Sequence, residues 1–189
     1  DRALALAIVR AAGAAGLAAR AADEAGIPLD GGTIAATRIL GAGGPIPFVI
    51  AAGNVHHGWE EAARLGDVVA REAEILGRRI AVVGLGGLSA ATFSSPIDPA
   101  ADAIRSAEDD ALSRRLLGLL QSGDAAGLAA AARASGGTPT DAGLRHLAFL
   151  AGACGHRFRG AEILAYGATW GAGAAVVDLR PAPGERTTP

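Results

Sequence analysis

The run RIAVVGL, residues 79–85, decides the fold, because it is short, apolar and rich in β-branched residues, as buried strands are. A similar run, IPFVIA at residues 46–51, lies between Pro45 and Gly53 and predicts a second buried strand. Residues 161–169 and 171–179 predict two more strands around a glycine-rich turn. We therefore expect a sheet at the centre of the fold.

Helical patterns separate these strands along the chain. The clearest is residues 59–76, whose apolar positions recur at helical spacing opposite a charged face, and which Gly77 ends. The Ala-rich residues 2–25 predict a helix followed by an extended piece at 17–22, and Gly31-Gly32 predicts a turn. Further helices are predicted at residues 109–121, 125–135 and 138–153.

Strands alternating with helices indicate an α/β fold, with a central, mostly buried sheet flanked by helices on both faces and a C-terminal strand pair. The length of 189 residues suits a single domain over residues 1–189, with a polar, flexible tail at residues 181–189. Because the sequence contains no methionine, we expect the native protein to have an N-terminal segment before residue 1.

Composition and charge exclude several classes of function. A net charge of -2, with both signs intermixed, leaves no broad basic footprint for nucleic acid. The longest charge-free run, residues 39–59, is broken by glycines, prolines and histidines, so no membrane-spanning helix is expected. No signal-peptide pattern opens the sequence and Cys154 has no second cysteine to pair with, so a cytoplasmic protein is expected.

Two polar motifs have both a functional and a structural interpretation. Gly84 and Gly86 have the spacing of a dinucleotide-binding loop, but no helix start follows them, so the nucleotide interpretation is weak. His56 and His57 could share a metal ion only within a loop, and no further ligand lies at helical spacing. A polar connection between a strand and a helix is therefore favoured for the histidine pair.

The start of the helix predicted at residues 138–153 carries a third group of polar residues. Asp141 follows Thr138 by three residues, which is the spacing of a capping box, and Arg145 lies four residues later on the same face. His146 is surrounded by apolar residues, where a histidine is more often a hydrogen-bonded structural residue than a catalyst.

From Asp30 onward the chain resembles the class III extradiol ring-cleavage dioxygenases, the protocatechuate 4,5-dioxygenase-like superfamily of catalytic B subunits. The segment EILAYGATWGAGAAVV at residues 162–177 is the most specific part of the resemblance, which covers nearly the whole chain. The matched part corresponds to about the C-terminal two thirds of such a subunit. The other three segments are LDGGT at residues 29–33, IAVVGLGGLSA at residues 80–90 and TDAGLRHLAFLAGA at residues 140–153.

The resemblance implies an active site that this sequence only partly retains. Active members hold Fe(II) with two histidines and one carboxylate, leaving positions open for an aromatic diol and O2. Two further histidines bind substrate and move protons, and this chain has Gly31 and Ala90 at their positions. The iron histidines would lie upstream, and Asp141 is the carboxylate nearest to the family's glutamate ligand. The remaining substrate-pocket candidates are Ser89, His146 and Tyr166.

A positioned acid–base group contributes about 10²- to 10⁴-fold in rate, so losing two such histidines predicts a subunit that does not catalyse ring cleavage. Within the family, 2-aminophenol dioxygenases pair a catalytic subunit with a homologous subunit that lacks the active-site residues. The resemblance therefore implies a degenerate subunit of a catechol or aminophenol ring-cleavage system. Its expected partner is a homologous catalytic subunit or a second copy, and Fe(II) is not expected to bind this chain alone.

Two alternatives remain open from the sequence. One is an active Fe(II) dioxygenase whose acid–base group is His56, His57 or Tyr166. The other is a small-molecule binding module without chemistry that uses the loop at residues 86–99.

Overall fold

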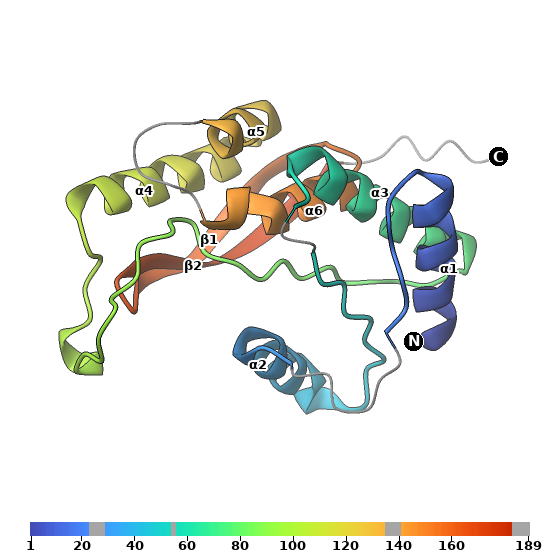
Figure 1. Ribbon diagram of the computed structural model, residues 1–189, viewed down its shortest axis with the longest axis horizontal. Helices are drawn as coiled ribbons and strands as arrows, with labels where there is room; N and C mark the ends of the chain where they lie inside the picture. Colours follow the sequence, from blue (N-terminus) through green and yellow to red (C-terminus); the bar gives the residue numbers. More distant parts are fainter. Residues whose placement is uncertain (23–28, 54–55, 135–140, 183–189) are drawn as a thin grey trace.

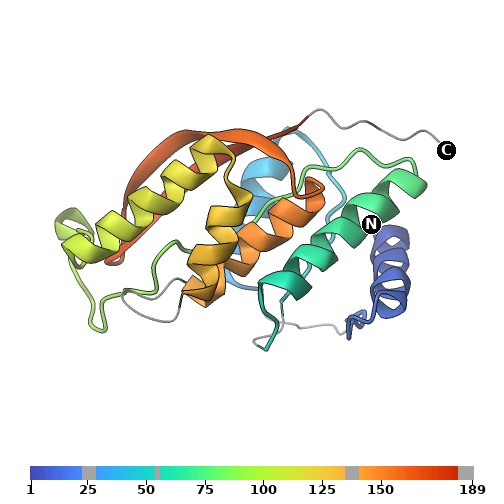
Figure 2. The same ribbon diagram turned by 90° about the horizontal axis from the view of Figure 1, so that it is seen from above.

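The computed structural model describes residues 1–22, 29–53, 56–134 and 141–182 (Figure 1). An antiparallel hairpin, β1 and β2, crosses the middle of the molecule, and α4 packs along it. The helix α6 crosses α3, and α1 packs on the other side of α3 (Figure 2). The elements are α1 (Arg2–Ala14), α2 (Gly31–Leu40), α3 (Trp59–Ile75), α4 (Ala107–Ser122), α5 (Ala125–Arg133), α6 (Arg145–Ala153), β1 (Phe158–Thr169) and β2 (Ala172–Pro181).

The helices with clear sequence signals form where they were predicted, because their ends are capped. The Ser106 hydroxyl accepts a hydrogen bond from the Asp109 amide at 3.1 Å and begins α4. The Asp124 carboxylate accepts from the Gly127 amide at 2.8 Å and begins α5. None of the helices in the described part of the chain combines the length and the apolar run that crossing a membrane requires.

The crossing of α3 and α6 is unusually close because both helices present glycine to it. A Cβ atom built on Gly66 would lie 2.0 Å from the carbonyl oxygen of Phe149, and one built on Gly152 would lie 1.8 Å from that of Ala63. Such distances leave no room for any side chain. The close contact at Gly66 and Gly152 lies between two apolar clusters. One cluster surrounds α4, α5, α6 and the hairpin, and the other lies between α1 and α3.

The C-terminal strand pair is confirmed, and a residue outside the hairpin, Asp102, forms hydrogen bonds with its turn. Trp170 and Gly171 have φ values of 54° and 88°, so both central residues of the two-residue turn are left-handed. The Asp102 carboxylate accepts hydrogen bonds from both turn amides, at 2.6 Å from Trp170 and 3.0 Å from Gly171. The predicted tail starts too early, because Pro181 still belongs to β2, and residues 183–189 lie outside the described part.

The fold class is confirmed as mixed α/β, but the central buried sheet is not present among the described residues. The segments 46–51 and 79–85 run as stretched connections without a partner strand, and Ile46 and Val83 are 52% and 48% exposed. An apolar run becomes a strand only where a second backbone supplies the hydrogen bonds, and none of the described backbone does so here.

Two predicted helix boundaries also need correction. The turn predicted at Gly31-Gly32 is the first turn of α2, because the Asp30 carboxylate caps it by accepting from the Thr33 amide at 2.8 Å and from the Thr33 hydroxyl at 2.6 Å. The helix predicted at residues 138–153 begins only at Arg145, after a left-handed stretch that includes Leu144 at φ 54°. Residues 135–140 lie outside the described part of the chain.

Candidate functional site

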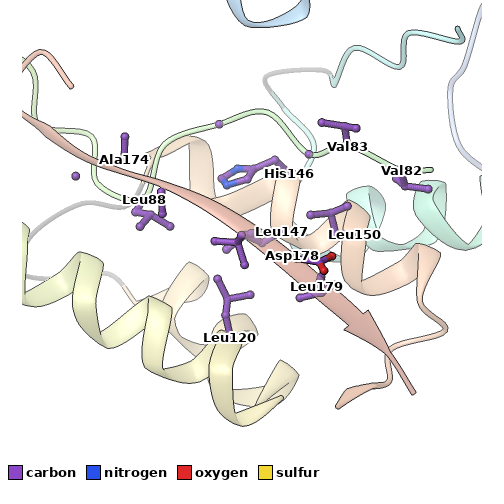
Figure 3. Close-up of a pocket in the computed structure, with 15 residues that line it drawn as sticks. Val82, Val83, Leu88, Leu120, His146, Leu147, Leu150, Ala174, Asp178 and Leu179 are labelled. Atoms are coloured by element: carbon purple, nitrogen blue, oxygen red, sulfur yellow. The ribbon is translucent and has the colours of Figure 1, made fainter. Parts of the chain in front are cut away.

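A cavity of about 250 Å³ lies between the 82–88 segment, α6 and β2 (Figure 3). Its wall is mainly apolar, with Leu88, Leu147 and Leu150 among the lining side chains. Among the described lining residues, His146 and Asp178 are the titratable ones. The volume of the cavity lies just below the range of roughly 300–1,000 Å³ that is usual for small-molecule sites.

The cavity owes its shape to two glycines that let the 82–88 segment run close over α6. A Cβ atom on Gly84 would lie 2.8 Å from Cδ1 of Leu150, and one on Gly86 would lie 2.3 Å from Nδ1 of His146. Close packing against α6 therefore explains the spacing of Gly84 and Gly86, which resembles that of a dinucleotide-binding loop. Figure 3 shows the His146 imidazole pointing toward this segment from the start of α6.

His146 is the sequence-predicted site residue that lies at the cavity, and it is half-buried there. His146 is a polar residue in a lining whose neighbours on α6, Leu147 and Leu150, are apolar. Asp178, an exposed residue of β2, was not anticipated from the sequence. Only the pairing of β2 in the hairpin brings Asp178 to the cavity wall, and no spacing relates it to His146.

Ser89 lies beside the cavity wall rather than in it. Its neighbour Leu88 lines the cavity, whereas the Ser89 side chain is 3% exposed and its hydroxyl has no hydrogen-bond partner among the described residues. A buried hydroxyl without a partner costs about 1–3 kcal/mol, so this position is not optimised for stability.

Gly31 and Ala90, where the resemblance places acid–base histidines, lie at the start of α2 and in the loop after residue 85. A Cβ atom on Gly32, next to Gly31 at the start of α2, would lie 3.8 Å from Cδ1 of Leu85. Leu85 in turn precedes Ala90 by five residues on the same loop. A Cβ atom on Gly31 itself would meet no atom within 4 Å, so the surroundings leave room for a larger side chain there.

Tyr166 lies behind the cavity wall and is held there by α4. Its hydroxyl donates a hydrogen bond to Oδ1 of Asp110 at 2.6 Å, and the Arg114 guanidinium lies 5.0 Å from its ring centroid. Burial raises the pKa of Tyr166, the hydrogen bond to Asp110 raises it further, and the Ser113 hydroxyl lowers it. Arg114 and Tyr166 hold the pKa of Asp110 below its usual value. These contacts favour a neutral, structural phenol.

The single tyrosine of the chain makes this arrangement measurable. Absorbance titration should give a midpoint for Tyr166 above its ordinary value of 10.0, and Asp110→Asn should lower that midpoint by removing the carboxylate. Because the folded-state pKa is raised, the stabilising contribution is complete below about pH 10 and is lost as the pH rises further.

The matched control is Asp67→Asn, since Asp67 makes the same type of contact with Arg71 as Asp110 makes with Arg114. The control should leave the midpoint of the tyrosine titration unchanged. Equal midpoints for the wild type, Asp110→Asn and Asp67→Asn would contradict the contact between Asp110 and Tyr166.

His56 and His57 do not line the cavity. The His57 carbonyl accepts a hydrogen bond from Arg145 at 3.4 Å, which ties the histidine pair to the start of α6 through its backbone. The Asp141 side chain lies outside the described part of the chain. Within the described residues, no three His, Cys, Asp or Glu side chains gather as a metal site would require.

Comparison with known proteins finds a relative of this chain. The chain is 37% identical over 178 residues to the 2-aminophenol 1,6-dioxygenase alpha subunit of a Pseudomonas species. The match covers 93% of this chain and 66% of that protein, so the chain spans about two thirds of the length of its relative. No protein-family model matches the chain.

Proposed function

Because this chain has an extradiol dioxygenase-like relationship, through its likeness to a 2-aminophenol 1,6-dioxygenase alpha subunit, we propose that it is a non-catalytic subunit of an extradiol ring-cleavage dioxygenase system. Its role would be to stabilise or complete a homologous catalytic subunit in the cytoplasm. The substrate met by the assembly would be a catechol or an aminophenol, because both are aromatic rings with adjacent groups that can bind one metal ion.

The proposal is supported by the residues at the two positions where the resemblance places acid–base histidines. Gly31 and Ala90 have side chains that cannot accept or release a proton. Open space remains around Gly31, so the fold itself does not account for the missing side chain. A lost acid–base group typically costs about 10²- to 10⁴-fold in rate, which a competent ring-cleaving subunit would not tolerate twice.

Tyr166 does not supply a replacement for these imidazoles. Its phenol is engaged with Asp110, and its pKa is raised away from neutrality, so it is a poor proton acceptor at physiological pH. His146 is the imidazole at the cavity, where it would bind a ligand rather than replace two separate groups.

The family also implies Fe(II), and the resemblance places its two histidine ligands upstream of residue 1 and its carboxylate ligand near Asp141. His146 and Asp178, the titratable residues of the described cavity wall, do not correspond to these ligands. The proposal therefore assigns the iron site to the homologous catalytic subunit.

Co-expression with a homologous catalytic dioxygenase subunit tests the proposal. The purified chain, with Fe(II) and O2, should not consume oxygen with 2-aminophenol or catechol. The co-purified assembly should turn over, and removing this chain should lower the yield or activity of its partner. Ring cleavage by the chain alone would contradict the proposal, as would a chain that stays monomeric and leaves the partner's activity unchanged.

The cavity favours a second candidate function, binding of a small aromatic molecule without chemistry. Gly86 and Leu88 of the loop at residues 86–99 contribute to its wall, and His146 offers a polar anchor. A ligand that binds only the folded state raises the melting temperature, so a thermal-shift measurement with 2-aminophenol and catechol tests this function directly. A shift that His146→Ala abolishes would support it.

A further inference from the structure

One face of the molecule is apolar and uncovered, and it is formed by two stretched segments. We call this the open face. In residues 82–85 the exposure alternates along the chain as it does in a strand, and Gly84 packs against α6. The first segment is exposed except at Val49, which packs against α1 and α3. The open face consists of Ile46, Phe48 and Ile50 in the first segment and Val83 and Leu85 in the second, each at least 38% exposed.

The residues on both sides of these segments are apolar, which distinguishes them from ordinary surface strands. A surface strand alternates apolar with polar residues, whereas a strand covered on both faces is apolar throughout. Helices already cover the inward side, and the first turn of α2 touches the outward side at Leu85. The rest of α2 stands apart from the other helices (Figure 1). The outward side therefore lacks a layer that its sequence requires.

The backbones of the two segments are also open to pairing. Within the described residues, no backbone hydrogen bond joins residues 80–85 to another segment. In residues 46–50, the Phe48 carbonyl accepts from the nitrogen of Asp1 at 2.7 Å, and no bond to another strand is present in the described part. Unpaired, apolar strand edges are the surfaces that proteins normally cover.

We propose that polypeptide of the same chain, outside residues 1–189, covers the open face and pairs with residues 46–50 and 80–85 as strands of one sheet. The relative supplies the argument for this occupant. This chain matches the relative over 93% of its own length, whereas a third of the relative has no counterpart in it. Segments apolar on both faces belong inside a permanently folded domain, and the unmatched third is the part of that domain that could enclose them.

A chimera tests the proposal without requiring the position of the missing part. In it, the matched 178 residues of the 2-aminophenol 1,6-dioxygenase alpha subunit are replaced by their counterparts here, so the relative keeps its own remaining third. Hydrogen exchange at residues 46–50 and 80–85 should slow by about 100-fold or more in the chimera relative to residues 1–189 alone. Equal exchange in the two proteins would overturn the proposal.

Substitutions distinguish burial on the open face from a general effect on folding. Ile50→Asp and Val83→Asp should leave the melting temperature of residues 1–189 unchanged and should lower that of the chimera by roughly 10 °C. The control Ile75→Asp, on the last residue of α3 and 73% exposed, should be neutral in both. A neutral effect of Val83→Asp in the chimera would also overturn the proposal.

The competing occupant of the open face is a second copy of this chain. Analytical ultracentrifugation distinguishes the two occupants, because it measures whether residues 1–189 are a monomer or a dimer in solution. If residues 1–189 form a dimer in which the two segments are protected from exchange, the open face is an interface between copies and the proposal fails. These measurements follow exchange, stability and mass rather than ring cleavage, so their outcome is independent of the proposed subunit role.

Discussion

Replacing Gly152 with alanine is expected to lower the free energy of unfolding by about 3 kcal/mol. The new Cβ atom would lie 1.8 Å from the carbonyl oxygen of Ala63 and 2.6 Å from its carbonyl carbon. Both are backbone atoms of α3, so no side-chain rotation can make room. The two helices must move apart, and the apolar contacts along their crossing are lost with them.

Gly118→Ala is the matched control, because Gly118 also lies inside a helix but has no atom within 4 Å of its built Cβ. Helix propensity favours alanine over glycine by about 1 kcal/mol in both helices, so the control should be slightly stabilising. The difference between the two changes in the free energy of unfolding, one a loss and one a gain, therefore measures the packing at the α3–α6 crossing. Urea denaturation followed by circular dichroism gives both values, and equal effects would contradict the close crossing.

Gly160→Ala should destabilise the protein by about 2–4 kcal/mol, because backbone conformation and packing both oppose the side chain. Gly160 has a φ of 136°, a conformation that is essentially restricted to glycine, and it lies at a shift in the register of the hairpin. A Cβ atom there would lie 2.3 Å from the carbonyl oxygen of Gln121. The change should therefore separate the start of β1 from the end of α4.

Gly167→Ala in the same strand is the control for this prediction. Its Cβ would meet no atom within 4 Å, and its φ lies outside the left-handed region, so the free energy of unfolding should change little. Thermal unfolding of both variants gives the comparison. A Gly160→Ala protein as stable as Gly167→Ala would show that β1 and α4 are not in such close contact.

Much of the fold could be predicted because its signals are local. The amphipathic pattern of α3 and the capping residue Asp124 of α5 lie within a few residues of the structure that they specify. The same holds for the glycine-rich turn between β1 and β2. The turn predicted at Gly31-Gly32 is wrong, although its signal is also local. Asp30, the residue just before the two glycines, caps the helix that begins there.

The candidate site could be predicted less completely, because its members come from distant parts of the chain. His146 was singled out from the sequence and does lie at the cavity. Tyr166 was singled out as well, but α4 holds it behind the wall through Asp110, a partner 56 residues away in the sequence. No local pattern relates those two residues, or brings Asp178 to the same cavity.

The sequence by itself determined α1, α3, α4, α5, the hairpin and the absence of imidazoles at positions 31 and 90, because each depends on the residues at one place in the chain. Only the tertiary structure decided which glycines permit close crossings and which polar groups meet at the cavity. It also leaves residues 46–51 and 79–85 unpaired within the described part of the chain, because a strand needs a neighbouring backbone that its own sequence cannot supply.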